Sequence, residues 1–305
     1  MCIKTEMEIV KVNNIKFDFG NAVELLALAE KTNMKISQIM LKREIEVFGK
    51  SESEVIADLM HSYDIMKNST QKALNEDLKS MGGLLGGEAK KLKARQDKNP
   101  VCGTLMSKVI AYAMGVLEVN TSMGLIVAAP TAGSAGVIPA VFTAIQEEYN
   151  FSDEQMLEAM FAASAIGYMI TRNATVSGAE GGCQAEIGAA SAMAAGAMTE
   201  LMGGSPSQVL DAASTAISNM LGLVCDPIAG LVEAPCQKRN AMGASNALIS
   251  AEITLAGIRN HIPFDETIEA MYQVGRSLPF ELRETALGGL AGTKTGCNLC
   301  KQIFG

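Results

Sequence analysis

Residues 171–202 read TRNATVSGAEGGCQAEIGAASAMAAGAMTELM, a glycine-rich stretch that continues into a long segment of alanine and methionine. Positions 189–202 hold mainly small or unbranched apolar side chains, which favour helices. Small side chains also let helices approach one another closely, and the β-branched and aromatic residues that favour strands are sparse here. The stretch therefore predicts a turn followed by a helix in a packed helical interior.

The same alternation of glycine-rich turns and apolar segments extends over the chain from position 81 onward. Further helices are expected at residues 105–117, 153–171, 207–222 and 241–258. The turns that separate the helices are expected at residues 81–92, 128–141, 171–188, 225–247 and 288–297. No alternating run of β-branched and aromatic residues requires a sheet, so the sequence predicts an all-α fold.

The first 80 residues are interpreted as a helical lead-in. Apolar residues recur at three- and four-residue spacing in 21–31 and 35–48, with charges opposite. Ser51 and the acidic residues after it form a helix-start pattern. No linker separates this part from the rest, so residues 1–305 are predicted to form one mainly helical catalytic domain. Residues 81–305 are predicted to contain the metal-binding and substrate-binding residues.

Composition limits the classes of function. With 48% hydrophobic residues, 305 residues can form a sizeable core. The net charge of −8 and the lack of a long basic run argue against a nucleic-acid partner. The N-terminus lacks the apolar region of a secretory signal, so a cytoplasmic location is expected. In that compartment, seven cysteines favour thiol, metal or cluster chemistry over disulfides.

One uncharged stretch, residues 119–146, is long enough to span a bilayer. It contains Pro130, Pro139 and three glycines, which would leave backbone polar groups unsatisfied in lipid. A buried loop and helix are therefore expected, with no membrane partner. A helical membrane or binding protein without catalysis is the alternative that this stretch supports.

Three cysteines lie in glycine- and proline-containing turns at the ends of helix-like segments: Cys183, Cys225 and Cys236. Loops on a rigid scaffold are where ligands and catalytic groups concentrate. A structural zinc site would call for paired CxxC or HxxxH spacing, and CxxC form occurs at Cys297–Cys300 without a nearby histidine. Spacing alone therefore indicates a possible metal site, and ordinary buried thiols remain an alternative.

Three ordered blocks resemble the iron–sulfur-dependent L-serine dehydratase family, specifically its catalytic alpha chain. They are VNTSMGLIVAAPTAGSAGVIPAV (119–141), TRNATVSGAEGGCQAEIGAASAMAAGA (171–197) and CDPIAGLVEAPCQKRNAMGASNA (225–247). The resemblance extends over most of residues 80–296. It implies a mainly helical catalytic part that dehydrates and deaminates L-serine to pyruvate and ammonia. It also implies a separate, smaller beta subunit, and an oligomer is expected.

The resemblance further implies that Cys183, Cys225 and Cys236 ligate a [4Fe–4S] cluster and leave one iron without a protein thiolate. That iron would act as a Lewis acid for the serine hydroxyl. In single-chain relatives a C-terminal cysteine folds back onto the open iron. This chain instead ends CNLCKQIFG, with Cys297 and Cys300 inside the end, so a capping role for either stays open.

Two other lyases are alternatives. A related iron–sulfur amino-acid lyase, such as an L-cysteine desulfidase, could bind a thiol at the same open iron. A pyridoxal-phosphate serine dehydratase would need a Schiff-base lysine, and no convincing lysine motif occurs.

Substrate-binding residues are expected in two segments. PTAGSAG (130–136), with Thr131 and Ser134, is interpreted as an anion cradle for the serine carboxylate, and a helix–helix turn is the alternative. Arg172 and Asn173 follow an apolar helix close to Cys183 and could bind the carboxylate or orient the amine. The alternative for this pair is a helix C-cap.

The general base is not identified by the sequence. Glu180 and Glu186 flank Cys183, and either could accept a proton or be a solvated or capping group. Lys294, in GTKTG, is a further candidate base or carboxylate partner, or an ordinary exposed loop lysine.

Overall fold

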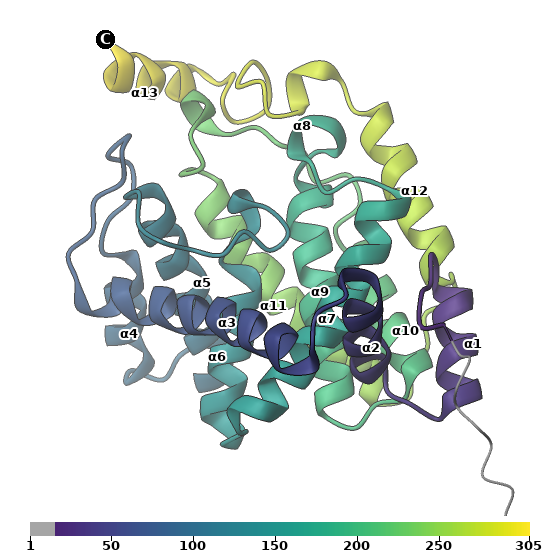
Figure 1. Ribbon diagram of the computed structural model, residues 1–305. Helices are drawn as coiled ribbons and strands as arrows, with labels where there is room; N and C mark the ends of the chain where they lie inside the picture. The colour runs from purple at the N-terminus through teal and green to yellow at the C-terminus, as the bar shows by residue number, and fades with distance from the viewer. Residues whose placement is uncertain (1–15) are drawn as a thin grey trace, which may run out of the picture.

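The computed structural model describes residues 16–305, which form a helical protein without a β-sheet (Figure 1). An isolated bridge between Cys225 and Arg283 is the strand-like pairing found in this part of the chain. The helices are α1 (Ala22–Thr32), α2 (Ile36–Phe48), α3 (Glu52–Asn75), α4 (Glu88–Gln96), α5 (Gly103–Thr121), α6 (Val137–Tyr149), α7 (Asp153–Asn173), α8 (Gly178–Gly181), α9 (Ala189–Leu201), α10 (Pro206–Ser218), α11 (Cys236–Leu255), α12 (Phe264–Ser277) and α13 (Lys294–Phe304). The all-α prediction is confirmed.

Helix α9 is the centre of the fold. Its residues from position 189 to 200 are all buried, and α6, α7, α10 and α11 pack around it (Figure 1). A Cβ at Gly196 would collide with Ile166 of α7 and would lie 3.1 Å from Val209 of α10. The small side chains noted in the sequence therefore allow the close helix approach that was expected of them.

The expected lead-in helices are present as α1, α2 and α3. Ser51 caps α3 in a reciprocal arrangement with Glu54, as its helix-start pattern predicts. Glu200 of α9 accepts hydrogen bonds from the backbone N–H groups of Ile36 (2.8 Å) and Ser37 (3.2 Å) at the start of α2. These bonds join the lead-in to the central helix. The division of the chain at residue 80 stays a prediction.

The boundaries of several helices differ from expectation, and α5, expected at 105–117, spans Gly103–Thr121. Helix α10 ends at Ser218 instead of 222, and α11 begins at Cys236 instead of 241. The glycines in 225–247 were interpreted as turn residues, but Gly243 lies within α11. A Cβ there would lie 2.5 Å from Ile187 Cγ2, so this glycine permits close packing and does not break the helix.

The uncharged stretch 119–146 comprises the end of α5, a loop and most of α6. Residues 137–145 of α6 are all buried, as expected for a core segment. Within residues 16–305, none of the helices combines the length and the apolar character that crossing a bilayer requires.

Candidate metal and substrate site

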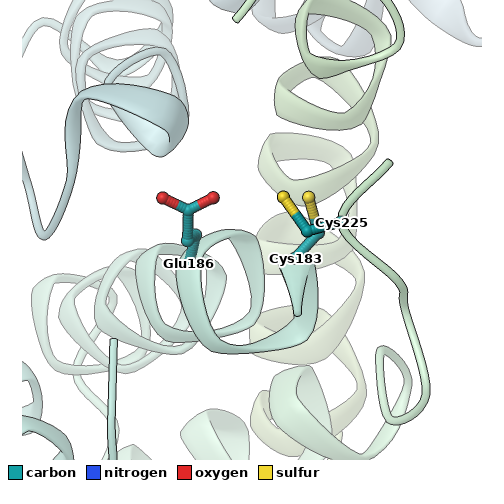
Figure 2. A group of neighbouring side chains, drawn as sticks. All are labelled: Cys183, Glu186 and Cys225. Atoms are coloured by element: carbon teal, nitrogen blue, oxygen red, sulfur yellow. The ribbon is translucent and has the colours of Figure 1, made fainter. Parts of the chain in front are cut away.

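The tertiary structure brings the predicted cysteines to one region. Cys183 directly precedes a π-helical turn (Gln184–Gly188), Cys225 lies in an extended segment, and Cys236 is the first residue of α11. The Sγ atoms of Cys183 and Cys225 and a carboxylate oxygen of Glu186 all lie within 4.8 Å of one another. Figure 2 shows these three side chains pointing to the same side of the turn.

Hydrogen bonds of neighbouring residues hold Cys183 against Cys225. The N–H of Gln184 donates to Leu223 O (3.0 Å), and the Gln184 side chain accepts from Gly222 N (2.8 Å). On the other side, Cys225 N donates to Leu282 O (2.8 Å). The two thiols are thus placed by three chain segments that are distant in sequence.

Cys236 is joined to the predicted anion cradle through Asn240. The Asn240 side-chain amide donates to Cys236 O (2.9 Å) and to Gly133 O (2.7 Å), and its oxygen accepts from Gly136 N (2.9 Å). Asn240 is itself fully buried. The first turn of α11 and the 130–136 loop are therefore held in one arrangement by a single side chain.

Glu186 is a buried carboxyl group between the cysteines and the 130–136 loop. Thr131 Oγ1 donates to Glu186 Oε1 at 2.7 Å. Added Cβ atoms at Gly133 and Gly178 would lie 2.9 and 2.7 Å from this carboxylate, so glycine is needed at both positions for the close approach. Burial raises the pKa of Glu186 to about 7, although the hydrogen bond from Thr131 acts in the opposite direction and lowers this pKa.

The surroundings of Cys225 and Cys236 favour the protonated form of these two thiols. The hydrogen bond with Cys183, followed by burial, raises the pKa of the Cys225 thiol well above its usual range. Burial, followed by the neighbouring Cys183, raises the pKa of Cys236 to about 12. A metal binds the thiolate form of cysteine, so metal binding at this site would release protons. The bound metal would also offset the free-energy cost of burying the negative charge of the thiolates.

A partly buried cation lies beside Cys183. Arg239 Nη1 is 3.6 Å from Cys183 Sγ, donates to Val224 O (2.9 Å) and forms an ion pair with Asp226 Oδ1 (2.7 Å). The other Asp226 oxygen accepts from Leu290 N at 2.7 Å. The Arg239 charge can therefore offset negative charge on thiolates and any group they hold.

The structure brings Thr131 and Ser134 to this site. Their hydroxyl oxygens lie 3.1 Å apart, and Thr131 also bonds to Glu186. Ser134 is fully buried, whereas Thr131 is partly exposed.

The structure gives Arg172 and Asn173 contacts elsewhere. Arg172 donates to the Tyr168 hydroxyl (2.8 Å), and Asn173 donates to Gly20 O (2.7 Å), both in the last turn of α7. Lys294 is the exposed first residue of α13. Their substrate-binding roles stay predictions.

The C-terminal thiols lie on α13. Cys297 is exposed and its Sγ is 3.7 Å from Ala291 O, whereas Cys300 is partly buried. A capping role for either one is neither supported nor contradicted by these contacts.

Sequence reasoning did not select Glu186 over Glu180, and it missed Asn240 and Asp226. One signal was available for Asn240, which lies four residues after Cys236 and thus on the same face of a helix. Recognising it required the helix to start at Cys236. Glu186 and Asp226 are held at the site by hydrogen bonds from Thr131 and Leu290, which lie 55 and 64 positions away in the sequence. Local sequence patterns do not predict such distant contacts.

Comparisons with known proteins identify relatives over nearly the whole chain. A sequence model described as "Serine dehydratase alpha chain" matches residues 31–291. The probable L-serine dehydratase alpha chain of Bacillus subtilis is 48% identical over 289 residues, covering 94% of this chain and 96% of that protein. The L-serine dehydratase alpha chain of Peptoniphilus asaccharolyticus is 46% identical over 286 residues, covering 93% and 98%. The L-serine dehydratase of Streptomyces coelicolor is 37% identical over 284 residues, covering 91% of this chain but 61% of that protein.

Proposed function

This chain belongs to the serine dehydratase alpha chain family, and from that premise we propose that it converts L-serine to pyruvate and ammonia. The observation that carries the proposal is the buried group of Cys183, Cys225 and Glu186, whose ligand atoms lie within 4.8 Å of one another. Soft thiol donors beside a buried carboxyl group suit a site that both holds a metal group and handles a proton.

We further propose that Cys183, Cys225 and Cys236 hold a [4Fe–4S] cluster. The donor set fits, because thiolates are the ligands of such clusters and all three sulfurs are buried. The Arg239 guanidinium next to Cys183 fits as well, because it offsets the negative charge of thiolates and sulfides. When bound, the cluster supplies an iron without a protein thiolate, a Lewis acid for the serine hydroxyl.

The chain's own part in the reaction is proton transfer and substrate positioning. Glu186 Oε1 accepts the Thr131 hydrogen bond, which leaves Oε2 to take the Cα proton. Loss of that proton and of hydroxide from Cβ gives aminoacrylate, which tautomerises to an imine and hydrolyses to pyruvate and ammonia. Because the carboxyl group is buried and beside the thiols, it is the described acidic group best placed to act as the base.

Serine binding is assigned to the 130–136 loop, whose Thr131 contacts the proposed base. Arg172, Asn173 and Lys294 are kept as further candidates for the carboxylate and amine. Alanine at a residue that binds serine should raise KM for L-serine. An unchanged KM in the Arg172, Asn173 and Lys294 variants would exclude these three side chains.

A separate beta subunit and a cytoplasmic location are part of the proposal. Two relatives that match over nearly their full length are named alpha chains, whereas the chain covers 61% of the Streptomyces coelicolor protein. We therefore expect weak activity from the isolated chain and a marked increase when the beta subunit is added. No increase on addition would contradict that dependence. Cell fractionation tests the location.

The decisive experiment is anaerobic reconstitution with iron and sulfide, followed by metal analysis and turnover assays. Cys183→Ala, Cys225→Ala and Cys236→Ala should each lose iron, sulfide and activity, and Cys102→Ala, at an exposed thiol, is the matched control. Full iron content and activity in any of the three site variants would overturn the assignment. Faster turnover of L-cysteine than of L-serine or L-threonine would instead favour the desulfidase alternative.

The role of Glu186 is tested by two substitutions. Glu186→Gln keeps the size and the acceptor for Thr131 but cannot take a proton, so kcat should fall by about 10²–10⁴-fold with little change in iron content. Glu186→Asp should retain part of the activity. Activity within twofold of wild type in Glu186→Gln would exclude this residue as the base.

A further inference from the structure

Glu233 is a buried carboxylate three residues before Cys236, and the site described above gives it no role. The residue is 1% exposed. Its carboxylate accepts three hydrogen bonds, from Ser80 Oγ (2.7 Å), Gly82 N (2.6 Å) and Leu84 N (3.0 Å). These donors lie 149 to 153 positions earlier in the chain. A buried carboxylate requires such bonds in place of those that it loses to water. Glu233 is therefore fixed to a distant loop.

The loop that supplies the donors is shaped to take this carboxylate. The Ser80 hydroxyl that donates to Glu233 also accepts from Leu85 N (3.0 Å), and Ser80 N donates to Leu85 O (3.1 Å). A Cβ at Gly82 would lie 2.9 Å from Glu233 Oε1 and 2.5 Å from Leu231 Cδ1. Glycine at this position therefore allows the carboxylate to approach the backbone. Part of the glycine-rich segment 81–92, predicted as a turn, thus binds a carboxylate of the protein itself.

Glu233 also belongs to the turn that leads into Cys236. Its carbonyl oxygen accepts from Gln237 N (3.0 Å) in the first turn of α11, so its backbone is part of the helix start. On the other side of Cys236, the Asn240 side chain donates to Cys236 O (2.9 Å). Asn240 holds the cysteine from within α11, and Glu233 holds the turn that precedes it.

The 225–236 loop therefore has a buried carboxylate close to each of its two cysteines. Asp226, at one end, pairs with Arg239 at 2.7 Å. Glu233, near the other end, is bound by the three donors described above. Residues 228–232 between them are partly or fully exposed. The two carboxylates thus fix the ends of a loop whose middle lies at the surface.

We propose that Glu233 is a positioning residue of the metal site: its carboxylate, bound by the 80–84 loop, fixes Cys236 where a cluster can bind. The inference rests on the proposed function, because Cys236 is one of the three proposed cluster ligands. A ligand that is already held in place loses less conformational freedom when the metal group binds. Release of Glu233 should therefore weaken the site although all three cysteines remain.

Glu233→Gln tests this positioning. The amide has the same size but offers one acceptor oxygen and one donor nitrogen, so it cannot accept from the donors on both sides of the carboxylate. After anaerobic reconstitution, the variant should lose iron to excess EDTA roughly tenfold faster than wild type, because a hydrogen bond to a charged group is worth at least that factor. The visible absorbance of the cluster follows the loss.

Glu118→Gln is the matched control. Glu118 of α5 is also 1% exposed, and it accepts from Gly87 N (2.9 Å) and Ala89 N (2.8 Å) near the other end of the glycine-rich segment. It joins that segment to α5 and not to the 225–236 loop, so its iron loss should stay within about twofold of wild type. Equal rates of iron loss in Glu118→Gln and Glu233→Gln would overturn the proposal.

A second measurement needs no cluster. In the metal-free chain, Cys236 is 6% and Cys183 2% exposed, so both thiols should react slowly with iodoacetamide. Glu233→Gln should speed the labelling of Cys236 roughly tenfold by opening the turn, and should leave Cys183 unchanged. Gly82→Ala, which crowds the carboxylate from the loop side, should give the same pattern.

Peptide mass spectrometry resolves the two thiols, and circular dichroism shows that each variant is folded. Gly82→Ala takes the place of Glu233→Gln if the latter does not fold. Labelling of Cys236 at the wild-type rate in the folded variants would overturn the proposal.

The two measurements separate this inference from the proposed function. A wild-type chain that takes up no iron and sulfide would refute the cluster, and the labelling would still decide whether Glu233 positions Cys236. A wild-type chain that holds a cluster, with unchanged iron loss in Glu233→Gln, would refute the positioning role and leave the cluster proposal standing.

Discussion

Removal of the Arg239 charge should destabilise the fold strongly, because it would leave a buried anion without its partner. The side chains of Asp226 and Arg239 are 3% and 13% exposed, and their charged atoms are 2.7 Å apart. After Arg239→Met, Asp226 would keep the hydrogen bond from Leu290 N and no cation. Breaking one side of a buried pair costs about 3–5 kcal/mol.

The retained Leu290 bond places the expected loss at about 3 kcal/mol, the lower end of that range. For a chain of this size, about 2–4 °C of Tm is lost per kcal/mol, so Tm should fall by roughly 6–12 °C. The double variant Asp226→Asn/Arg239→Met removes both charges and keeps the Leu290 acceptor. It should therefore recover much of the loss.

Thermal unfolding of the cluster-free chain, followed by circular dichroism, measures this effect. The matched control is Lys35→Met, which breaks a pair with Glu158 whose side chains are 56% and 59% exposed. That change should cost under about 1 kcal/mol. A Tm for Arg239→Met within 2 °C of wild type, or a double variant no more stable than the single one, would refute the reasoning.

Three further predictions concern the site glycines and a buried acid. Gly178→Ala would place a Cβ 2.7 Å from Glu186 Oε2 and 3.2 Å from Cys225 Sγ, so the iron content after reconstitution should fall. In the control variant Gly188→Ala the added Cβ would lie 3.8 Å from its nearest neighbour, so the iron content should be retained. Equal iron content in the two variants would contradict the crowding of the site by the Gly178→Ala side chain. Gly243→Ala should lower the free energy of unfolding by up to about 2 kcal/mol, because overpacking costs about 1–3 kcal/mol and the gain in helix propensity is about 1 kcal/mol. Burial raises the pKa of Glu200 above its usual value of 4.5, so its stabilising contribution is complete below about pH 4.5 and declines as pH rises through the folded-state pKa. Urea unfolding of Glu200→Gln and wild type should therefore show the variant gaining relative stability from pH 4 to pH 7, and a pH-independent difference would contradict this assignment.

The helical architecture could be predicted from sequence because helix formation depends on residues three and four positions apart. The spacing of apolar residues and the Ser51 start pattern placed α1 to α3, and the alanine-rich segment placed α9. The role of glycine was harder to predict, because glycine is common in turns but also occurs where helices pack closely. Gly243 lies inside α11 and permits its close packing against Ile187.

The sequence by itself determined the helical class and, through its resemblance to a family, the three cysteines. The tertiary structure decided which groups share the site with them. Cys183 and Cys225 are 42 positions apart, and Thr131 is 55 positions from Glu186, yet these side chains meet. Such contacts depend on how whole helices pack around α9. Local patterns carry no information about that packing, so the folded chain alone decided between Glu186 and Glu180, placed Asn240 at the site and paired Asp226 with Arg239.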